Sequence, residues 1–313
     1  MNIENIGKDN EAENRRNKMV SCIVTTYKRP IEIVKRALDS VVHQTYQDIE
    51  LIVVNDAPME CALVEEIGKL LERYTVSKQY IVHEKNKGAC AARNTGIAHA
   101  KGEYLAFLDD DDEWLPEKLE LQLQYMKDED IALVYCSHYT ISKVGSKRLI
   151  EEPLAKEGES KEAFEQLLKE NFVGSTSYPL LRTEAVRAVG GFTEGLKASQ
   201  DHDLWLRIAK SYSILYCRKP LVNLYYSEDA ISRNIENSVQ GYEYLLDKYE
   251  WFYKEHKDIR NYRLNYLVYC CICFHKFNYA TKYWWRAVRI KAFSRHNLMV
   301  VTKVFERITV KRV

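Results

Sequence analysis

Short apolar runs alternate with amphipathic stretches through the first 135 residues of this 313-residue chain. Runs rich in β-branched and aromatic residues predict strands at Val20–Thr26, Leu51–Val54, Tyr80–Val82, Tyr104–Leu108 and Ile131–Tyr135. Apolar residues at helical spacing predict helices between them, at 30–42, 63–71, 89–100 and from Pro116 onward. Strands and helices that alternate in this way favour a mainly parallel, doubly wound α/β sheet.

The alternation ends near Ser142, and the chain beyond it is organised differently. We expect helices near Ala163–Lys169 and Asp201–Lys210, and two short strands in Ile214–Tyr226 that Lys219-Pro220 separates. From about residue 237 the pattern is helical, rich in tyrosine and increasingly basic. The sequence thus predicts a disordered leader at 1–18, an α/β domain at 19–236 and a basic, aromatic-rich helical region at 237–313.

Four consecutive aspartates, Asp109 to Asp112, directly follow the predicted strand that ends at Leu108. Adjacent carboxylates repel one another and lose hydration on burial. A divalent cation such as Mn²⁺ or Mg²⁺ removes this conflict, because hard cations prefer carboxylate oxygens and keep open positions for phosphate. In an extended chain Asp109 and Asp111 point to the same side. A solvated acidic loop is the alternative, but open α/β sheets bind ligands where strands end, which favours a metal–nucleotide site.

The formal net charge of +1 hides an uneven distribution. From Lys254 to Val313 there are fourteen Lys and Arg against three acids, a balance of +11 that leaves −10 for the rest of the chain. The small net charge predicts no strong attraction to nucleic acid. A basic end on an acidic body instead suggests an anionic partner, either a membrane surface or an anionic polymer. A helical module for packing, or for a homo-oligomer, is the equal alternative.

The eight cysteines show neither a disulfide framework nor a zinc pattern. Several lie in apolar runs, where a thiol behaves as a small hydrophobe, so we expect reduced thiols in a cytosolic protein. The first eighteen residues lack the apolar core of a secretory signal, and the longest apolar stretch, 267–274, is too short to cross a bilayer. We therefore expect a cytoplasmic protein that is at most peripheral at the inner membrane face.

Five motifs follow one another along the chain. They are Val20 to Pro30, Val53-Val54-Asn55-Asp56, Asn86 to Ile97, Phe107 to Trp114, and Gln200-Asp201-His202-Asp203-Leu204-Trp205-Leu206-Arg207. Together they resemble family two of the inverting glycosyltransferases, which have the GT-A fold. The resemblance covers roughly Met19 to Asn234, and five motifs in the right order are specific although each alone is weak.

The resemblance implies a nucleotide-sugar site at the strand ends. Thr25, Tyr27 and Arg29 offer a hydroxyl, a ring and a cation that suit a nucleoside. Asp56 can accept a hydrogen bond from a uracil N–H, and Arg93 can reach a pyrophosphate, as guanidinium groups do. Simpler readings are a plain strand residue for Thr25, a helix cap for Asp56 and a salt-bridged helix arginine for Arg93.

The acidic run has divided roles in enzymes of this family. The resemblance implies that Asp109 contacts the ribose or the metal, that Asp110 lines the nucleotide-sugar site, and that Asp111 is the principal metal ligand. Bound Mn²⁺ or Mg²⁺ would stabilise the leaving diphosphate. Trp114 is expected to pack rather than to bind substrate.

Asp201 is the candidate general base, because an inverting transfer needs a carboxylate that deprotonates the acceptor hydroxyl. Asp203 is the competing candidate, but its side chain would point elsewhere on a helix. The chain departs from the family at Asn55 and Gln200, where acids are usual, and at Ser227, where a histidine often helps to hold metal or phosphate. Metal affinity or loop closure is therefore expected to differ, and His202 is not an obvious replacement.

The resemblance as a whole implies metal-dependent transfer of a sugar from a nucleotide diphosphate sugar, expected to be a UDP-sugar. The acceptor would be a hydroxyl of a glycan or lipid-linked glycan in cell-surface polysaccharide synthesis. A nucleotidyltransferase is one alternative, but it predicts a glycine-rich, lysine-containing loop where this chain has Tyr27-Lys28-Arg29-Pro30. A degenerate glycan-binding relative is the other, and the presence of Asp109, Asp111 and Asp201 argues against it.

Overall fold

The computed structural model describes residues 18–142, 144–150, 160–225, 234–300 and 302. The expected leader, apart from Lys18, and the departure at Ser227 lie outside the described residues. By internal contacts the chain divides into two compact units. Unit 1 comprises Met1–Phe164, Phe172–Gly195 and Leu204–Ser227, and unit 2 comprises Glu165–Asn171, Leu196–Asp203 and Glu228–Val313. The predicted domain boundary at residue 236 stays a prediction.

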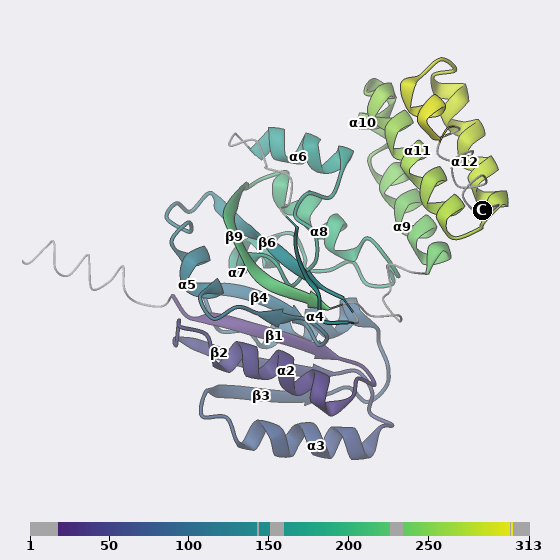
Figure 1. The fold of residues 1–313 in the computed structure, drawn as a ribbon. Helices are drawn as coiled ribbons and strands as arrows, with labels where there is room; N and C mark the ends of the chain where they lie inside the picture. The colour runs from purple at the N-terminus through teal and green to yellow at the C-terminus, as the bar shows by residue number, and fades with distance from the viewer. Residues whose placement is uncertain (1–17, 143, 151–159, 226–233, 301, 303–313) are drawn as a thin grey trace, which may run out of the picture. The chain divides into compact units, whose positions relative to one another are not determined.

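Unit 1 is built on a nine-stranded sheet in the described part of the chain (Figure 1), with strand order β3-β2-β1-β4-β8-β6-β9-β5 and β7 paired to β6. The strands are β1 Val20–Thr26, β2 Ile49–Asn55, β3 Ser77–Val82, β4 Tyr104–Asp109, β5 Glu113–Trp114, β6 Ile131–Ile141, β7 Lys147–Ile150, β8 Leu180–Arg182 and β9 Ser213–Tyr225. The ladders among β1, β2, β3 and β4, and that between β6 and β9, are parallel and long. Shorter antiparallel ladders join β8 to β4 and β6. The predicted mainly parallel α/β sheet is confirmed.

Helices cover both faces of the parallel part of the sheet. Among the described residues up to 225, the helices are α2 Ile31–Val42, α3 Cys61–Glu72, α4 Ala89–His99, α5 Lys118–Leu123, α6 Ser160–Lys169, α7 Thr183–Ala188 and α8 Gln200–Ala209. On one face Cys22 and Val24 of β1 join a core cluster with Leu38 of α2. Ile23 points to the other face, where α4 packs so closely that a Cβ on Gly96 would lie 2.4 Å from Ile23 Cγ2. Glycine at this position therefore lets α4 approach the sheet.

The expectation of two short strands around Lys219-Pro220 is wrong. The structure has one strand, β9, from Ser213 to Tyr225. Its parallel pairing with β6 shifts register beside Pro220, which pairs with Ser137 while Cys217 pairs with Cys136. Proline cannot donate to a ladder, so the pairing absorbs it in an irregularity instead of ending the strand.

In the described part of unit 2, helices α9 Ile235–Lys248, α10 Glu250–Glu255, α11 Lys257–Cys273 and α12 Phe277–Ile290 lie together (Figure 1). Buried leucine and aromatic side chains form their interior, including Leu245, Tyr253, Leu264, Leu267 and Tyr283. The amide of Asn261 donates to Ala287 O at 2.9 Å and to Asn297 Oδ1 at 3.0 Å, so a buried polar network joins α11 to the chain after α12. The predicted helical C-terminal extension is confirmed.

Two further observations concern the whole of the described chain. All eight cysteines are free thiols, as expected. Within the described ranges, no helix is both long enough and apolar enough to cross a membrane.

Candidate functional site

The ends of β1, β2 and β4 meet at one edge of the sheet in unit 1 (Figure 1). Thr25 pairs with Asp109 across the β1–β4 ladder, and Thr26 pairs with Asn55 across the β1–β2 ladder. The Asp56 N–H donates to Thr26 O at 2.9 Å, so the chain stays in register just beyond β2. The parallel pairing thus places Thr25, Asp56 and Asp109 along the same carboxyl edge, where open α/β sheets bind ligands.

Asp109 contacts an arginine and two hydroxyl groups. Arg93 Nη2 donates to Asp109 Oδ1 at 2.7 Å, and Arg93 itself is 7% exposed. Thr176 Oγ1 lies 3.1 Å from both carboxylate oxygens, and Ser175 Oγ lies 3.4 Å from Oδ2. Arg93 comes from α4, one turn before the close helix–sheet contact at Gly96. The helix packing therefore sets where this guanidinium lies.

Arg29 spans the next two acids of the run. Its Nε donates to Asp110 Oδ1 and its Nη2 to Asp111 Oδ2, both at 3.0 Å. A second arginine, Arg36 of α2, donates to the backbone carbonyl of Asp111 at 2.6 Å. Burial, followed by the negative charge of Asp109, raises the pKa of Asp111 to about 6. Arg29 and Arg36 therefore stabilise only part of the negative charge on this loop.

Ser177 forms hydrogen bonds to two residues of the acidic loop, a role that was not predicted from the sequence. Its hydroxyl accepts from the Asp109 N–H at 3.1 Å and donates to Asp112 Oδ2 at 2.6 Å. Burial raises the pKa of Asp112 well above its usual range, and the charges of Asp109 and Asp111 raise it further. Trp114, 2% exposed, donates from Nε1 to Ser177 O at 2.9 Å, so it packs as expected. The hydroxyl run Ser175-Thr176-Ser177 is visible in the sequence, but no local pattern there connects it to the acidic loop.

Asp56 is 3% exposed and holds the turn that leads into α4. Its carboxylate accepts from the backbone N–H groups of Lys87 at 2.8 Å and Gly88 at 2.7 Å. His83 Nδ1 lies 2.7 Å from the same carboxylate. Tyr27, in contrast, is half exposed beyond the end of β1. Asp56 and Tyr27 both lie at the predicted edge of the sheet. Asp56 orders the turn before α4, and Tyr27 offers an exposed aromatic ring.

The acidic run fits a divalent cation whose coordination is completed by other ligands. Among the described residues, no group of three or more His, Cys, Asp or Glu side chains is arranged to hold a metal. Mg²⁺-type sites, however, commonly use one or two carboxylates together with water and phosphate oxygens. Burial and, after it, the negative charge of Asp109 raise the pKa of Asp111, and a bound cation would favour the ionised form of this carboxylate.

Asp201 belongs to unit 2, in the first turn of α8. Asn171 Nδ2 donates to Asp201 Oδ2 at 3.2 Å, and the His202 N–H donates to Oδ1 at 2.7 Å. Asp203 is fully buried and pairs with Lys248 at 2.6 Å. Burial, with a contribution from Arg263, lowers the pKa of His202 to about 3, so its ring is neutral. The partly exposed Asp201 is therefore the more accessible of the two candidate bases.

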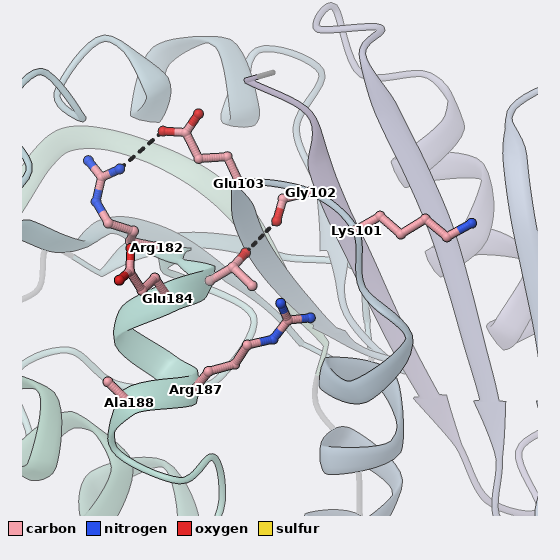
Figure 2. Close-up of a pocket in the computed structure, with 8 residues that line it drawn as sticks. Lys101, Gly102, Glu103, Arg182, Glu184, Arg187 and Ala188 are labelled. Atoms are coloured by element: carbon pink, nitrogen blue, oxygen red, sulfur yellow. Dashed lines mark hydrogen bonds and ion pairs between the residues drawn. The ribbon is translucent and has the colours of Figure 1, made fainter. Parts of the chain in front are cut away.

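A hollow of about 470 Å³ lies in unit 1 away from these residues (Figure 2). It is lined around Gly102 and Glu103, which precede β4, whereas Asp109 is the last residue of that strand. Its arginines are engaged: Arg182 pairs with Glu103 at 3.0 Å, and Arg187 donates to two backbone carbonyls. The hollow and the acidic run therefore lie at opposite ends of β4.

Comparisons with known proteins agree with the geometry. Residues 21–190, more than half of the chain, match Glycosyl transferase family 2. A glycosyltransferase of Methanocaldococcus jannaschii is 32% identical over 62% of this chain and 66% of its own length. The chain thus spans just under two thirds of that relative. WcaA of Escherichia coli K12, named as a colanic acid biosynthesis glycosyl transferase, is 27% identical over 78% of this chain and 83% of its own length.

Two solved structures share the fold at low sequence identity. Residues 1–349 of Staphylococcus aureus TarS, in complex with UDP-GlcNAc, give a TM-score of 0.59 at 18% identity, over 89% of this chain and 74% of that one. The mannosyltransferase PcManGT from Pyrobaculum calidifontis, in complex with GDP-Man and Mn²⁺, gives 0.63 at 15% identity, over 94% and 81%. The predicted GT-A architecture is confirmed. The chain belongs to glycosyl transferase family 2.

Proposed function

We propose that this glycosyltransferase moves a sugar, with inversion, from a nucleotide diphosphate sugar to a hydroxyl of a glycan acceptor. The observation that carries the proposal is the cluster at the end of β4, where Asp109, Asp110 and Asp111 pair with Arg29 and Arg93 at the carboxyl edge of a parallel sheet. The complexes of TarS with UDP-GlcNAc and of PcManGT with GDP-Man and Mn²⁺ support a nucleotide-sugar donor. Membership of the family favours sugar transfer over the nucleotidyltransferase alternative.

In this proposal the strand ends bind the donor, which we take to be UDP-linked. Thr25, Tyr27 and Asp56 lie along the nucleoside side of the site, with the half-exposed ring of Tyr27 available for stacking. Arg29 and Arg93 provide the positive charge for the pyrophosphate. Asp110 adjoins the nucleotide sugar through its contact with Arg29.

Asp109 and Asp111 would hold Mn²⁺ or Mg²⁺. The cation, when bound, supplies positive charge that stabilises the leaving diphosphate. Arg29 already provides positive charge at Asp111, and Thr176 orients the carboxylate of Asp109.

We assign Asp201 as the general base that takes the proton from the acceptor hydroxyl. Attack on the anomeric carbon from the side opposite the nucleotide gives inversion. The hydrogen bond from Asn171 Nδ2 to Asp201 Oδ2 helps to orient the carboxylate. Asp203 is less suited, because it is fully buried and engaged by Lys248.

The acceptor that we propose is a growing cell-surface polysaccharide or a lipid-linked glycan. The name of WcaA, which refers to colanic acid biosynthesis, supports an envelope polysaccharide. We place the enzyme in the cytoplasm, peripheral at the inner membrane face, where such acceptors are assembled. The basic balance of the C-terminal region supports an anionic surface as a partner.

The experiment is a panel of sugar nucleotides incubated with Mn²⁺, and release of nucleoside diphosphate is measured with and without glycan acceptors. We expect release from at least one UDP-sugar, and a fall of about 10²–10⁴-fold in the transfer rate of Asp201→Asn. Donor affinity should be unchanged in this variant, because the base acts on the acceptor. A chain that binds UDP but transfers no sugar from any donor would instead be a degenerate relative. Full turnover by Asp201→Asn would show that the wrong carboxylate has been assigned.

A further inference from the structure

Asp203, two residues after the candidate base, forms an ion pair with a residue of the C-terminal helices. Its carboxylate is fully buried, and Lys248 Nζ of α9 lies 2.6 Å from Oδ1. A buried carboxylate is costly unless it is paired and hydrogen-bonded. The pair therefore ties the first turn of α8 to the last turn of α9 within unit 2.

A second contact joins the same two segments about two turns earlier on α9. A Cβ placed on Gly241 would lie 2.7 Å from Ser199 Oγ and 2.8 Å from the backbone oxygen of Ala198. Ser199 has a φ of 58°, a left-handed backbone that is uncommon outside glycine. The absence of a side chain at Gly241 thus allows α9 to lie directly against the backbone that turns into α8.

Two further hydrogen bonds hold the first turn of α8. Asn171 donates to the Asp201 carboxylate, and His202 Nε2 lies 2.7 Å from Leu167 O. The segment 167–171 is in turn held to the C-terminal helices, because Tyr253 Oη donates to Leu168 O at 2.7 Å. Asp201 therefore contacts the segment 167–171 and closely follows the segment 198–199, and helices beyond residue 234 contact both segments.

We propose that α9 positions the general base, with Lys248 and Gly241 as positioning residues that act through the first turn of α8. This inference rests on the proposed role of Asp201 and deepens it. Helix α9 is then part of the catalytic machinery rather than an appendage to it. In this proposal the effect of Lys248 on the reaction passes through the placement of the Asp201 carboxylate.

The test replaces Lys248 by Met in the full-length chain, which keeps most of the side-chain stem and removes the ammonium group. We expect kcat to fall by roughly 10²-fold, since small misplacements of a reacting group have effects of that size. The KM for the donor and the Mn²⁺-dependent affinity for UDP should stay at the parent values. Lys248→Arg, which retains the charge, should recover most of kcat. The matched control is Lys254→Met, which removes an exposed lysine that pairs with Glu250 in the neighbouring helix and should leave kcat unchanged.

A double variant separates positioning from general loss of structure. If Lys248 acts through the base, adding Lys248→Met to Asp201→Asn should lower kcat little further. Multiplied effects in the double variant, or a folded Lys248→Met with parental kcat, would overturn the inference. Should Lys248→Met fail to fold, Gly241→Ala serves instead, and the same split between kcat and donor KM is expected.

Failure of the proposed function and failure of the positioning role give different results. If the parent chain transfers no sugar from any donor in the panel, it is the proposed function that fails. If the parent transfers sugar and Asp201→Asn is impaired while Lys248→Met is not, only the positioning role fails.

Discussion

The carboxylates after β4 meet two arginine side chains, and the balance between them determines what the loop can bind. Arg93 contacts Asp109, and Arg29 bridges Asp110 and Asp111. Asp111 nevertheless has a raised pKa, because burial and the charge of Asp109 outweigh the favourable effect of Arg29. Residual negative charge of this kind favours a cation, and oxygen ligands favour Mg²⁺ or Mn²⁺.

Replacement of Asp111 by Asn should therefore separate metal binding from folding. We expect Mn²⁺-dependent affinity for UDP to fall by roughly 10²-fold or more, since even indirect partners of a metal commonly contribute about 10–100-fold. The melting temperature should not fall, because one repelling charge is removed. Titration calorimetry with UDP, in the presence and absence of Mn²⁺, measures the effect, and Glu129→Gln on the exposed surface is the control. An unchanged Mn²⁺-dependent affinity would remove Asp111 from the metal site.

At the scale of elements, the acidic loop depends on the segment that precedes β8. Gly174 to Ser177 brings three hydroxyls to Asp109 and Asp112, and β8 then pairs antiparallel with β4. Ser177 is fully buried and serves both the Asp109 N–H and the Asp112 carboxylate. The loop is thus held by a neighbour that is far away in the sequence.

Ser177→Ala should weaken both the fold and donor binding. The change leaves the buried Asp112 carboxyl without this hydroxyl, and loss of such a partner costs about 1–3 kcal/mol. We expect the free energy of unfolding to fall by about that amount in urea denaturation, with weaker Mn²⁺-dependent UDP binding. Ser146→Ala, at an exposed turn beside β7, should change neither quantity. Parental UDP affinity in a destabilised Ser177→Ala would limit this residue to a structural role.

The strands and loops around the site show which parts of the fold could be predicted from the sequence. Strands β1, β2 and β4, and the acids at the ends of β2 and β4, were predictable, because an apolar run followed by a polar residue is a local pattern. The hydroxyls of Ser175 to Ser177 were not, since their role depends on the long-range pairing of β8 with β4. The continuous β9 was missed for a similar reason, because pairing with β6 accommodates Pro220. The spacing of Asp201 and Asp203 likewise predicted that their side chains point in different directions. Only the fold shows that Lys248 lies against Asp203.

At the scale of the molecule, the charge of the chain is concentrated in its last helices. From Lys276 to Thr302 the sequence has six Lys and Arg and no acid. The same stretch exposes large apolar side chains, with Phe277 at 57%, Trp285 at 54% and Phe293 at 99% exposure. On α12, Trp285 lies four residues before Arg289 and three after Lys282, so ring and cations share one face of the helix. Aromatic and basic side chains on one surface are typical of segments that bind at a membrane interface.

We therefore expect the full chain to bind vesicles that contain anionic lipid and to leave neutral vesicles largely unbound. Each basic residue near such a surface contributes about 1 kcal/mol, and the attraction is screened over about 10 Å at 0.1 M salt. Binding, measured by co-sedimentation, should weaken as salt is raised. The double variant Trp285→Ser/Phe293→Ser should lose most of the binding, because the inserted apolar side chains are gone. Trp251→Ser is the matched control, since Trp251 is also 54% exposed but lies in α10 between Glu250 and Glu255. Equal binding to neutral vesicles, or full binding by the double variant, would show that this surface serves another partner, such as a second copy of the chain.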